Sequence, residues 1–187
     1  MAFYKGAKRF VILLVALTAL TLIFYFSYKI FMRMAYPLKY KQLIVKAAGD
    51  HQVDKYLVLA VIREESRFKE DSISSKGALG LMQLMPKTAK WISAQRGMSY
   101  KQAELFEPRV NIDQGSWYFS YLSKRYKKQE LALAAYNSGA SVLDRWMKAN
   151  PQGDLKNFVF PETRNFVARV TKTQKIYQKL YKESDFE

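Results

Sequence analysis

The sequence predicts an all-α protein in which one helical domain follows a single membrane-spanning helix. Three observations support this prediction. Residues 10–28, FVILLVALTALTLIFYFSY, contain no charged side chain. Apolar residues in the remaining segments recur at helical spacing, and strand patterns are nearly absent. No internal repeat or low-complexity linker divides the rest of the chain, whose length suits one domain of ordinary size.

Residues 10–28 predict a membrane helix that follows a short tail, residues 1–9. Nineteen residues in a helix extend about 28 Å, which is close to the hydrocarbon thickness of a bilayer. A cleaved signal peptide is the alternative, but no small-x-small cleavage site follows the apolar run. We therefore expect an uncleaved anchor, with an aromatic belt at the outer headgroups formed by Phe24, Tyr25, Phe26 and Tyr28.

The charges around this span do not by themselves set its orientation. Basic residues both precede it (Lys5, Lys8, Arg9) and follow it (Lys29, Arg33, Lys39, Lys41). The positive-inside count therefore does not favour export of the C-terminal part, although long domains cross membranes largely regardless of charge. Topology has to be assigned from function.

The rest of the chain predicts helices joined by short connections. Residues 29–52 form a juxtamembrane segment with a helix over 40–48, and Asp54 is the expected N-cap of the next helix. Residues 69–80, KEDSISSKGALG, are rich in Ser and Gly and predict a loop. Further helices are expected over residues 86–95, 109–126, 130–137, 141–149 and 162–181.

The composition excludes several kinds of site. The chain has no cysteine and one histidine, so disulfides, thiolate ligands and histidine metal clusters are impossible. That histidine, His51, lies in the polar stretch GDHQVD, and we expect it to face solvent. We expect neither a metal nor another cofactor.

The net charge of +15 suits an anionic partner such as lipid headgroups, wall polymer or nucleic acid. Charge alone cannot choose among these partners. No nucleic-acid-binding motif accompanies the basic residues, so nucleic acid is not an expected partner.

The stretch VIREESRF, residues 61–68, places two glutamates at the end of an apolar run. At about 100° per residue, Glu65 lies about 20° from the middle of the apolar stripe and Glu64 about 80° off it. The stripe consists of Leu57, Val58, Val61, Ile62 and Phe68. Burial would raise the pKa of Glu65 and prepare it as a general acid. A carboxylate that caps the chain or pairs with a nearby Lys or Arg is the alternative.

Four blocks in this order resemble the catalytic domain of soluble lytic transglycosylases, relatives of goose-type lysozyme. They are ESRF at 65–68, GALGLMQ at 77–83, AAYNSG at 134–139 and FPETRNFV at 160–167. The segment at 107–122, EPRVNIDQGSWYFSYL, also resembles the family, with Glu107 where Asp is more usual. The resemblance covers about residues 53–183 and implies a lysozyme-like helical catalytic domain there.

The resemblance implies an enzyme that cleaves the β-1,4 bond between N-acetylmuramic acid and N-acetylglucosamine without water. Glu65 would protonate the glycosidic oxygen and then, as a carboxylate, accept the proton of the muramic acid 6-hydroxyl. That oxygen would close onto C1 and give a 1,6-anhydro end. The acetamido group of the sugar would take the place of the second carboxylate that ordinary glycosidases use.

The resemblance also implies a set of substrate-binding residues, each with a structural alternative. The set is Ser74, Gln83, Met85, Tyr136, Asn137 and Glu162. Ser74 would lie near the acetamido group, Gln83 and Met85 would line the sugar groove, and the Tyr136 hydroxyl would approach the catalytic acid. The alternatives are loop capping for Ser74, core filling for Met85 and a helix-dipole effect for Glu162.

Two other functions remain open from the residues. A goose-type muramidase with the same fold would need a second carboxylate to activate water, and Glu70 or Asp71 is available in the loop. A non-catalytic module that binds anionic wall polymer is the second alternative. For the favoured enzyme the expected partners are peptidoglycan glycan strands and the cell membrane, with the catalytic domain on the extracytoplasmic side. The sequence leaves the oligomeric state open.

Overall fold

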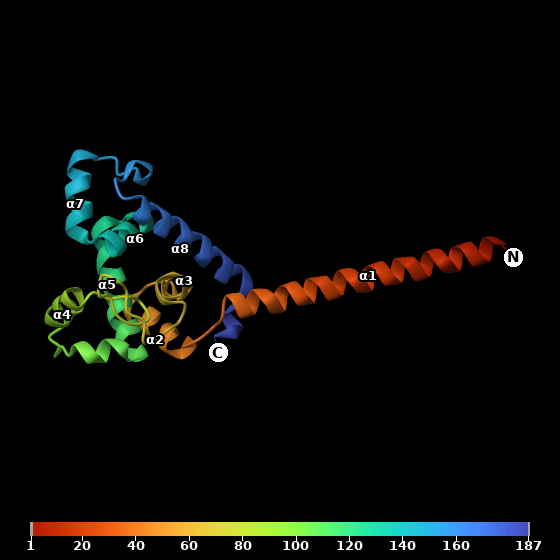
Figure 1. Cartoon of the computed structure of the whole chain (residues 1–187), viewed down its shortest axis with the longest axis horizontal. Helices are drawn as coiled ribbons and strands as arrows, with labels where there is room; N and C mark the ends of the chain where they lie inside the picture. The colour runs from red at the N-terminus through yellow and green to blue at the C-terminus, as the bar shows by residue number, and fades with distance from the viewer. Residues whose placement is uncertain (1, 187) are drawn as a thin grey trace. The chain divides into compact units, whose positions relative to one another are not determined.

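The computed structural model describes residues 2–186 and confirms the all-α fold (Figure 1). It divides into a helical unit that ends at Leu38 and a compact unit that begins at Lys39. Between residues 2 and 186 no strand forms. Two isolated bridges, Ile73 with Leu79 and Leu79 with Leu84, tighten the long loop of the compact unit.

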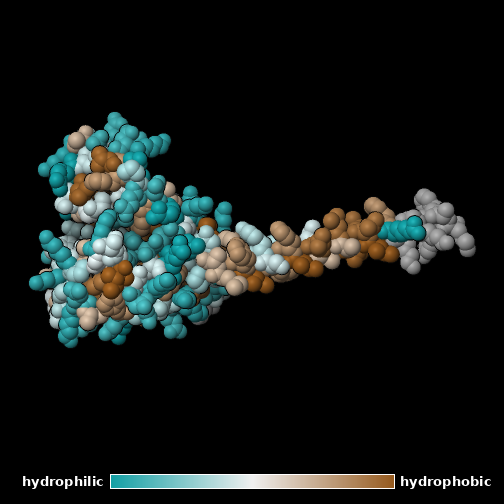
Figure 2. All heavy atoms as spheres, in the orientation of Figure 1, coloured by the Kyte–Doolittle hydropathy of each residue, from teal (hydrophilic) through white to brown (hydrophobic). Residues whose placement is uncertain are grey.

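The first unit is one helix, α1, which spans Ala2–Ala35. Its segment Arg9–Ala35 is long and apolar enough to cross a membrane, and none of its most apolar window is buried. Figure 2 shows the hydrophobic residues along this helix. The helix continues past the predicted span of 10–28, and residue 1 of the predicted tail lies outside the described residues.

The compact unit starts with α2, Lys41–His51, which is longer than the predicted helix over 40–48. The added turn brings His51 against α5, where its side chain is only 10% exposed and its Nε2 lies 2.7 Å from Asp113 Oδ1. Arg96 donates to the other Asp113 oxygen at 2.6 Å, and these two partners hold the pKa of Asp113 below its ordinary value against the opposing effect of burial. The prediction that His51 faces solvent was wrong, because it assumed that the helix ended before this residue.

The next helix, α3, spans Lys55–Ser66 and carries both glutamates. Asp54 caps it as predicted, accepting the backbone N–H of Tyr56 at 2.8 Å. All residues from Leu57 to Ile62 are buried, so α3 is enclosed on every side rather than along one stripe. Phe68 is buried but does not belong to the helical stripe, because Arg67 and Phe68 adopt positive φ and end the helix.

The remaining α-helices begin and end within about two residues of the predicted bounds, which is the usual uncertainty of helix ends. They are α4 (Pro86–Gln95), α5 (Pro108–Tyr126), α6 (Gln129–Ser138), α7 (Ala140–Ala149) and α8 (Pro161–Leu180). A proline begins α4, α5 and α8, where its missing N–H costs no helical hydrogen bond. Three short 3₁₀ segments were not predicted: η1 (Gln102–Phe106), η2 (Leu155–Asn157) and η3 (Glu183–Asp185).

Two helices organise the compact unit. The central helix α5 contacts α2, α4, α6 and η1, and α8 packs on α3 and α6. The buried side of α8 carries Thr163, Phe166, Val170, Thr173 and Tyr177, which recur at helical spacing. Helix α8 therefore supports α3, the helix that carries Glu65.

Asn111 of α5 holds the loop between α3 and α4 in place. Its fully buried amide accepts the N–H of Met82 at 2.7 Å. The same amide donates to the carbonyls of Leu79 at 2.9 Å and Leu105 at 2.8 Å. Gly80 sits so close to this amide, at φ 74°, that an added Cβ would lie 2.2 Å from the Leu105 carbonyl oxygen. Only glycine therefore fits at position 80, beside the Asn111 amide that clamps the loop.

Replacing Asn111 by Ala should destabilise the protein severely. The Met82 N–H and the Leu105 carbonyl would lose a buried partner, and each such group costs about 1–3 kcal/mol when left unsatisfied, whereas the Leu79 carbonyl would keep the Leu84 N–H. We expect the free energy of unfolding, measured by urea denaturation, to fall by about 3 kcal/mol or more. Asn165→Ala, at an exposed position of α8, is the matched control and should change it by less than about 0.5 kcal/mol. Equal stability of both variants would contradict the clamp.

Candidate active site

Glu65 lies in the last turn of α3, where the helix meets the long loop. Its side chain is half-buried, and within residues 2–186 no donor or cation pairs with its carboxyl group. Burial is the main cause that raises the Glu65 pKa to about 8, assisted by the negative charges of Glu162 and Glu64. Arg169 opposes this rise but does not overcome it. A carboxyl group that keeps its proton near neutrality can serve as a general acid.

Glu64, its neighbour, is bound on all sides by structural partners. Its side chain is 11% exposed and forms ion pairs with Arg63 at 3.0 Å and Arg169 at 3.2 Å. Thr173 of α8 donates a further hydrogen bond at 2.7 Å. Glu64 thus points at α8 and not into solvent. Two adjacent carboxylates of one helix turn therefore meet opposite environments.

The loop that follows α3 is built by its own polar side chains. The Ser74 hydroxyl accepts the N–H of Ala78 at 2.9 Å, which is the capping contact that the structural alternative for Ser74 requires. Gln83 adopts φ 50°, an unusual conformation for a residue with a side chain. Its amide donates to the carbonyls of Ser72 at 3.1 Å and Gly80 at 2.9 Å, so both hydrogens are used within the loop. The Gln83 carbonyl oxygen remains available for a ligand.

Met85 ends this loop, and Tyr136 of α6 contacts the loop at Met82. Met85, the residue before α4, is 40% exposed, so the core-filling alternative does not describe it. The Tyr136 hydroxyl donates to the Met82 carbonyl at 2.7 Å. Burial raises the Tyr136 pKa well above its ordinary value, and the charge of Glu65 raises it further. The hydroxyl therefore stays protonated and lies within electrostatic reach of the Glu65 carboxylate.

The last predicted residues join α6 to the start of α8. Thr163 donates to the Asn137 side-chain oxygen at 2.8 Å. The exposed Glu162 forms a 3.3 Å ion pair with Lys76 of the loop. The fold thus connects all four sequence blocks around Glu65: the α3 end, the loop, the α6 end and the α8 start.

Sequence reasoning missed three residues of this arrangement. Arg169 and Thr173 hold Glu64, and no local pattern indicates that α8 packs beside α3. Asn111 supports the loop from α5, although its position in the helix RVNIDQG gave a usable signal. An asparagine that interrupts the buried side of a helix needs buried partners for its amide.

Comparison with known proteins finds one matching family and several relatives. Residues 42–159 match the family described as Transglycosylase SLT domain. A putative soluble lytic murein transglycosylase of Haemophilus influenzae is 31% identical over 155 residues, with 79% of this chain and 26% of the relative covered. The membrane-bound lytic murein transglycosylase C of Histophilus somni is 32% identical over 171 residues, with 75% of this chain and 46% of the relative covered.

Solved structures agree with these relatives. An inactive glutamate-to-glutamine mutant of the lytic transglycosylase Slt from Pseudomonas aeruginosa superposes with a TM-score of 0.72 at 31% identity. The match covers 80% of this chain and 25% of that protein. The 70 kDa soluble lytic transglycosylase SLT70 of Escherichia coli has a TM-score of 0.73 at 24% identity, covering 82% of this chain and 27% of that protein, and supports the fold alone.

The match has clear limits along the sequence. This chain spans between a quarter and a half of the length of these relatives. The family match begins in α2 and ends before α8, so it includes Glu65, the loop and the α6 block, and leaves out the whole block at 160–167 with the α8 start. Because it nevertheless covers well over half of the chain, the chain belongs to the transglycosylase SLT domain family.

Proposed function

We propose that this chain is a membrane-anchored lytic transglycosylase that cleaves the glycan strands of peptidoglycan to 1,6-anhydro-muramoyl ends. The observation that carries the proposal is Glu65, a half-buried carboxyl group without a pairing partner whose pKa is raised to about 8. Membership of the SLT family agrees with this chemistry. So does the Pseudomonas relative, whose solved form carries glutamine in place of a glutamate and is inactive.

The proposed reaction uses Glu65 twice. The protonated carboxyl group donates its proton to the glycosidic oxygen as the bond from C1 to that oxygen breaks. The resulting carboxylate then removes the proton from the 6-hydroxyl of the muramic acid residue. The freed oxygen forms the bond to C1, which closes the 1,6-anhydro ring and restores protonated Glu65. The arrangement needs one carboxyl group that changes its protonation state and no water molecule.

The residues around Glu65 are proposed to bind the sugars. Ser74, Gln83 and Met85 belong to the loop beside the acid, and the exposed Met85 side chain offers an apolar surface to a sugar ring. Tyr136 keeps a neutral hydroxyl near Glu65. Asn137 and Glu162 form the far side, at the end of α6 and the start of α8.

The loop carboxylates do not supply an evident second catalytic group beside Glu65. The groups that influence its pKa are Arg169, Glu162 and Glu64, and neither Glu70 nor Asp71 is among them. Glu70 instead accepts a hydrogen bond from Tyr40 at 2.9 Å. Glu64 is occupied by two arginines and a threonine. A second carboxylate positioned to activate water, which an inverting or retaining hydrolase needs, therefore has no good candidate in the loop.

The proposed location is the extracytoplasmic side of the cell membrane, with α1 as a single-pass anchor. The length and apolar character of Arg9–Ala35 support the anchor. Several relatives are named membrane-bound transglycosylases, and peptidoglycan lies outside the membrane.

Replacing Glu65 by Gln should lower cleavage of purified peptidoglycan by at least about 100-fold, because the only proposed proton carrier is lost while the shape is kept. Glu64→Gln is the matched control. It should retain activity at low temperature but lose about 1–2 kcal/mol of stability, since one oxygen that binds Arg169, Arg63 or Thr173 becomes an amide. Mass spectrometry of the released fragments measures both activity and reaction type. Full activity of Glu65→Gln, or products heavier by one water, would refute the assignment.

The raised pKa of Glu65 predicts a specific dependence of stability on pH. The unfolded chain releases this proton near pH 4.5 and the folded protein near pH 8, so between these values the folded state binds more protons. The protonated Glu65 carboxyl group then makes its full contribution to the free energy of unfolding below about pH 4.5, and this contribution is lost as pH rises toward 8. As pH rises across this interval, the free energy of unfolding of Glu65→Gln should increase by on the order of 4 kcal/mol relative to that of the parent. Cleavage by the parent should fall above about pH 8.

Thermal melts of the parent and Glu65→Gln between pH 5 and 9 test this dependence, with Glu64→Gln as the control for removal of a neighbouring charge. A Glu65→Gln variant that is less stable than the parent by a constant amount at every pH would identify Glu65 as a paired structural anion.

The topology can be tested with protoplasts. Protease added outside should digest the compact unit, residues 39–187, and leave a fragment that contains Arg9–Ala35. Immunoblotting with epitope tags at each end identifies the fragments, and lysed protoplasts show the digestion of an unprotected protein. Protection of the compact unit in intact protoplasts would place it in the cytoplasm and contradict the proposal.

A further inference from the structure

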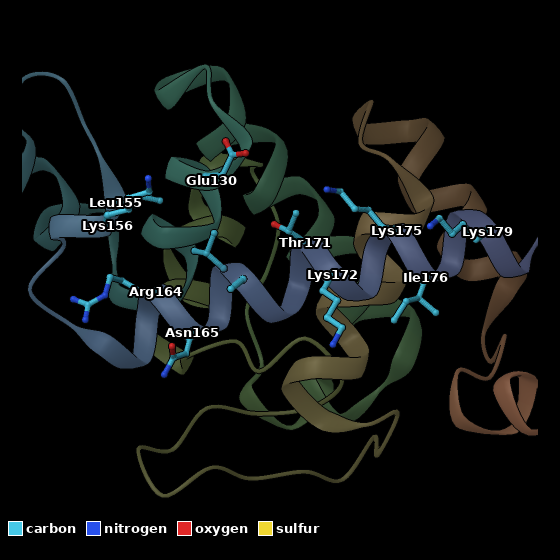
Figure 3. Close-up of a pocket in the computed structure, with 12 residues that line it drawn as sticks. Glu130, Leu155, Lys156, Arg164, Asn165, Thr171, Lys172, Lys175, Ile176 and Lys179 are labelled. Carbon is cyan, nitrogen blue, oxygen red and sulfur yellow. The ribbon is translucent and has the colours of Figure 1, made fainter.

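A groove of about 850 Å³ follows the outer side of α8, away from Glu65 and the proposed sugar-binding residues. Figure 3 shows its lining, which comes from α8, the η2 turn and the start of α6. Leu155, Val167, Ala168 and Ile176 form an apolar floor. The rim is basic: it carries Lys156, Arg164, Lys172, Lys175 and Lys179 against a single acid, Glu130.

The four lysines of this rim are not engaged in the fold. Among residues 2–186, no carboxylate forms an ion pair with Lys156, Lys172, Lys175 or Lys179. Other surface lysines differ in this respect: Lys46, Lys76 and Lys101, for example, each pair with an acid. Unpaired cations above an apolar floor suit a partner that is both anionic and partly apolar, because lysine stems can cover apolar surface while the ammonium groups reach phosphates.

The groove lies on the side of α8 that faces away from α3. At about 100° per residue, Ala168, Lys175 and Lys179 point away from the buried residues Phe166, Val170 and Tyr177. That buried side packs on α3, whose last turn carries Glu65. A surface that occupies the groove therefore leaves the α3 side of α8 uncovered.

The chain itself makes a lipid surface the nearest anionic partner. Residues 36–40 connect α1 to α2, and five residues extend at most about 17 Å. The start of α2 lies beside η3, which follows α8, since Lys41 donates to the Asp185 carbonyl. The start of α3 lies beside the end of α8, since Tyr56 donates to the Tyr181 carbonyl. An anchored α1 thus keeps the compact unit within a short tether of the bilayer, and a short tether gives a high effective concentration.

We propose that this outer side of α8, with Lys156, Lys172, Lys175 and Lys179, docks on anionic phospholipid headgroups of the membrane in which α1 is anchored. The lysines bind the phosphates, and the apolar floor receives the upper, apolar part of the lipid. This proposal rests on the proposed anchoring by α1 and is independent of the catalytic assignment. Docking would turn the α3 side, and Glu65 with it, away from the lipid and toward the cell wall.

Site-specific labelling tests the contact, because the chain contains no cysteine. The full chain with Ala168→Cys, in the groove, carries an environment-sensitive fluorophore and is reconstituted in nanodiscs. Ala94→Cys, at an exposed position of α4, is the matched label. We expect quenching by spin-labelled lipid headgroups for the Ala168 label in discs with phosphatidylglycerol, little in discs of phosphatidylcholine alone, and little for the Ala94 label in either. Quenching should weaken as salt is raised.

Charge reversal then identifies the residues. Combining Lys172→Glu, Lys175→Glu and Lys179→Glu should reduce the docked-to-free ratio by about tenfold or more. Lys90→Glu, Lys124→Glu and Lys148→Glu together make the same net change at exposed lysines elsewhere and should preserve docking. If the first triple variant melts early, the corresponding Gln variants take its place. Retained cleavage of soluble glycan strands shows that the site itself is intact.

Three results would overturn the proposal. The first is equal quenching of the Ala168 and Ala94 labels in anionic discs. The second is equal loss of docking in the two triple variants, which would indicate a response to net charge only. The third is a response of the Ala168 label to added anionic wall polymer but not to anionic lipid, which would identify a polymer-binding groove. Failure of α1 to enter the discs would instead refute the anchoring on which the proposal rests.

Discussion

The side-chain amide of Asn111 binds the Met82 N–H and the carbonyls of Leu79 and Leu105, and the site depends on this contact. The loop from Arg67 to Met85 contains no helix or strand, so its backbone N–H and C=O groups need other hydrogen-bond partners. Each group that stays buried without a partner costs free energy of folding, and the turns within the loop do not pair all of them. Asn111 fixes Met82, and the Met82 carbonyl in turn receives the Tyr136 hydroxyl. One buried amide on the central helix thereby sets the distance between the loop and α6.

The adjacent residues Glu64 and Glu65 show how packing assigns different chemistry to identical side chains. Glu64 meets two arginines and a threonine, which stabilise its charge and tie α3 to α8. Glu65 has lost much of its hydration and gained no donor, so its neutral form is favoured. Arg169 contributes to both environments: it pairs with Glu64 and only moderates the pKa of Glu65. Glu64 forms the ion pair with Arg169, and Glu65 therefore keeps a raised pKa and can hold a proton.

The two sides of α8 have separate tasks in this arrangement. The buried side supports α3 and supplies Thr163, which holds Asn137. The outer side carries lysines that form no ion pair with any carboxylate of residues 2–186. One helix can have two such sides because the direction of a side chain depends on its angle around the helix axis, and that angle changes with every residue. If the outer side docks on lipid, the helix that supports the catalytic acid also orients it relative to the membrane.

The sequence by itself determined the helices, the apolar span, the Asp54 cap and the three blocks at 65–68, 77–83 and 134–139 that lie within the family match, because these depend on local periodicity, capping and short motifs. It also singled out Glu65 by helical phase. It was wrong about His51, whose helix continues by one turn, and it treated Phe68 as helical although two positive φ angles end α3 first. Only the tertiary structure decided that Glu64 is a paired anion, that Asn111 clamps the loop, and that unpaired lysines line one side of α8. Those facts depend on which distant segments pack together, and a residue's charge partners and burial are set by neighbours that its local sequence does not contain.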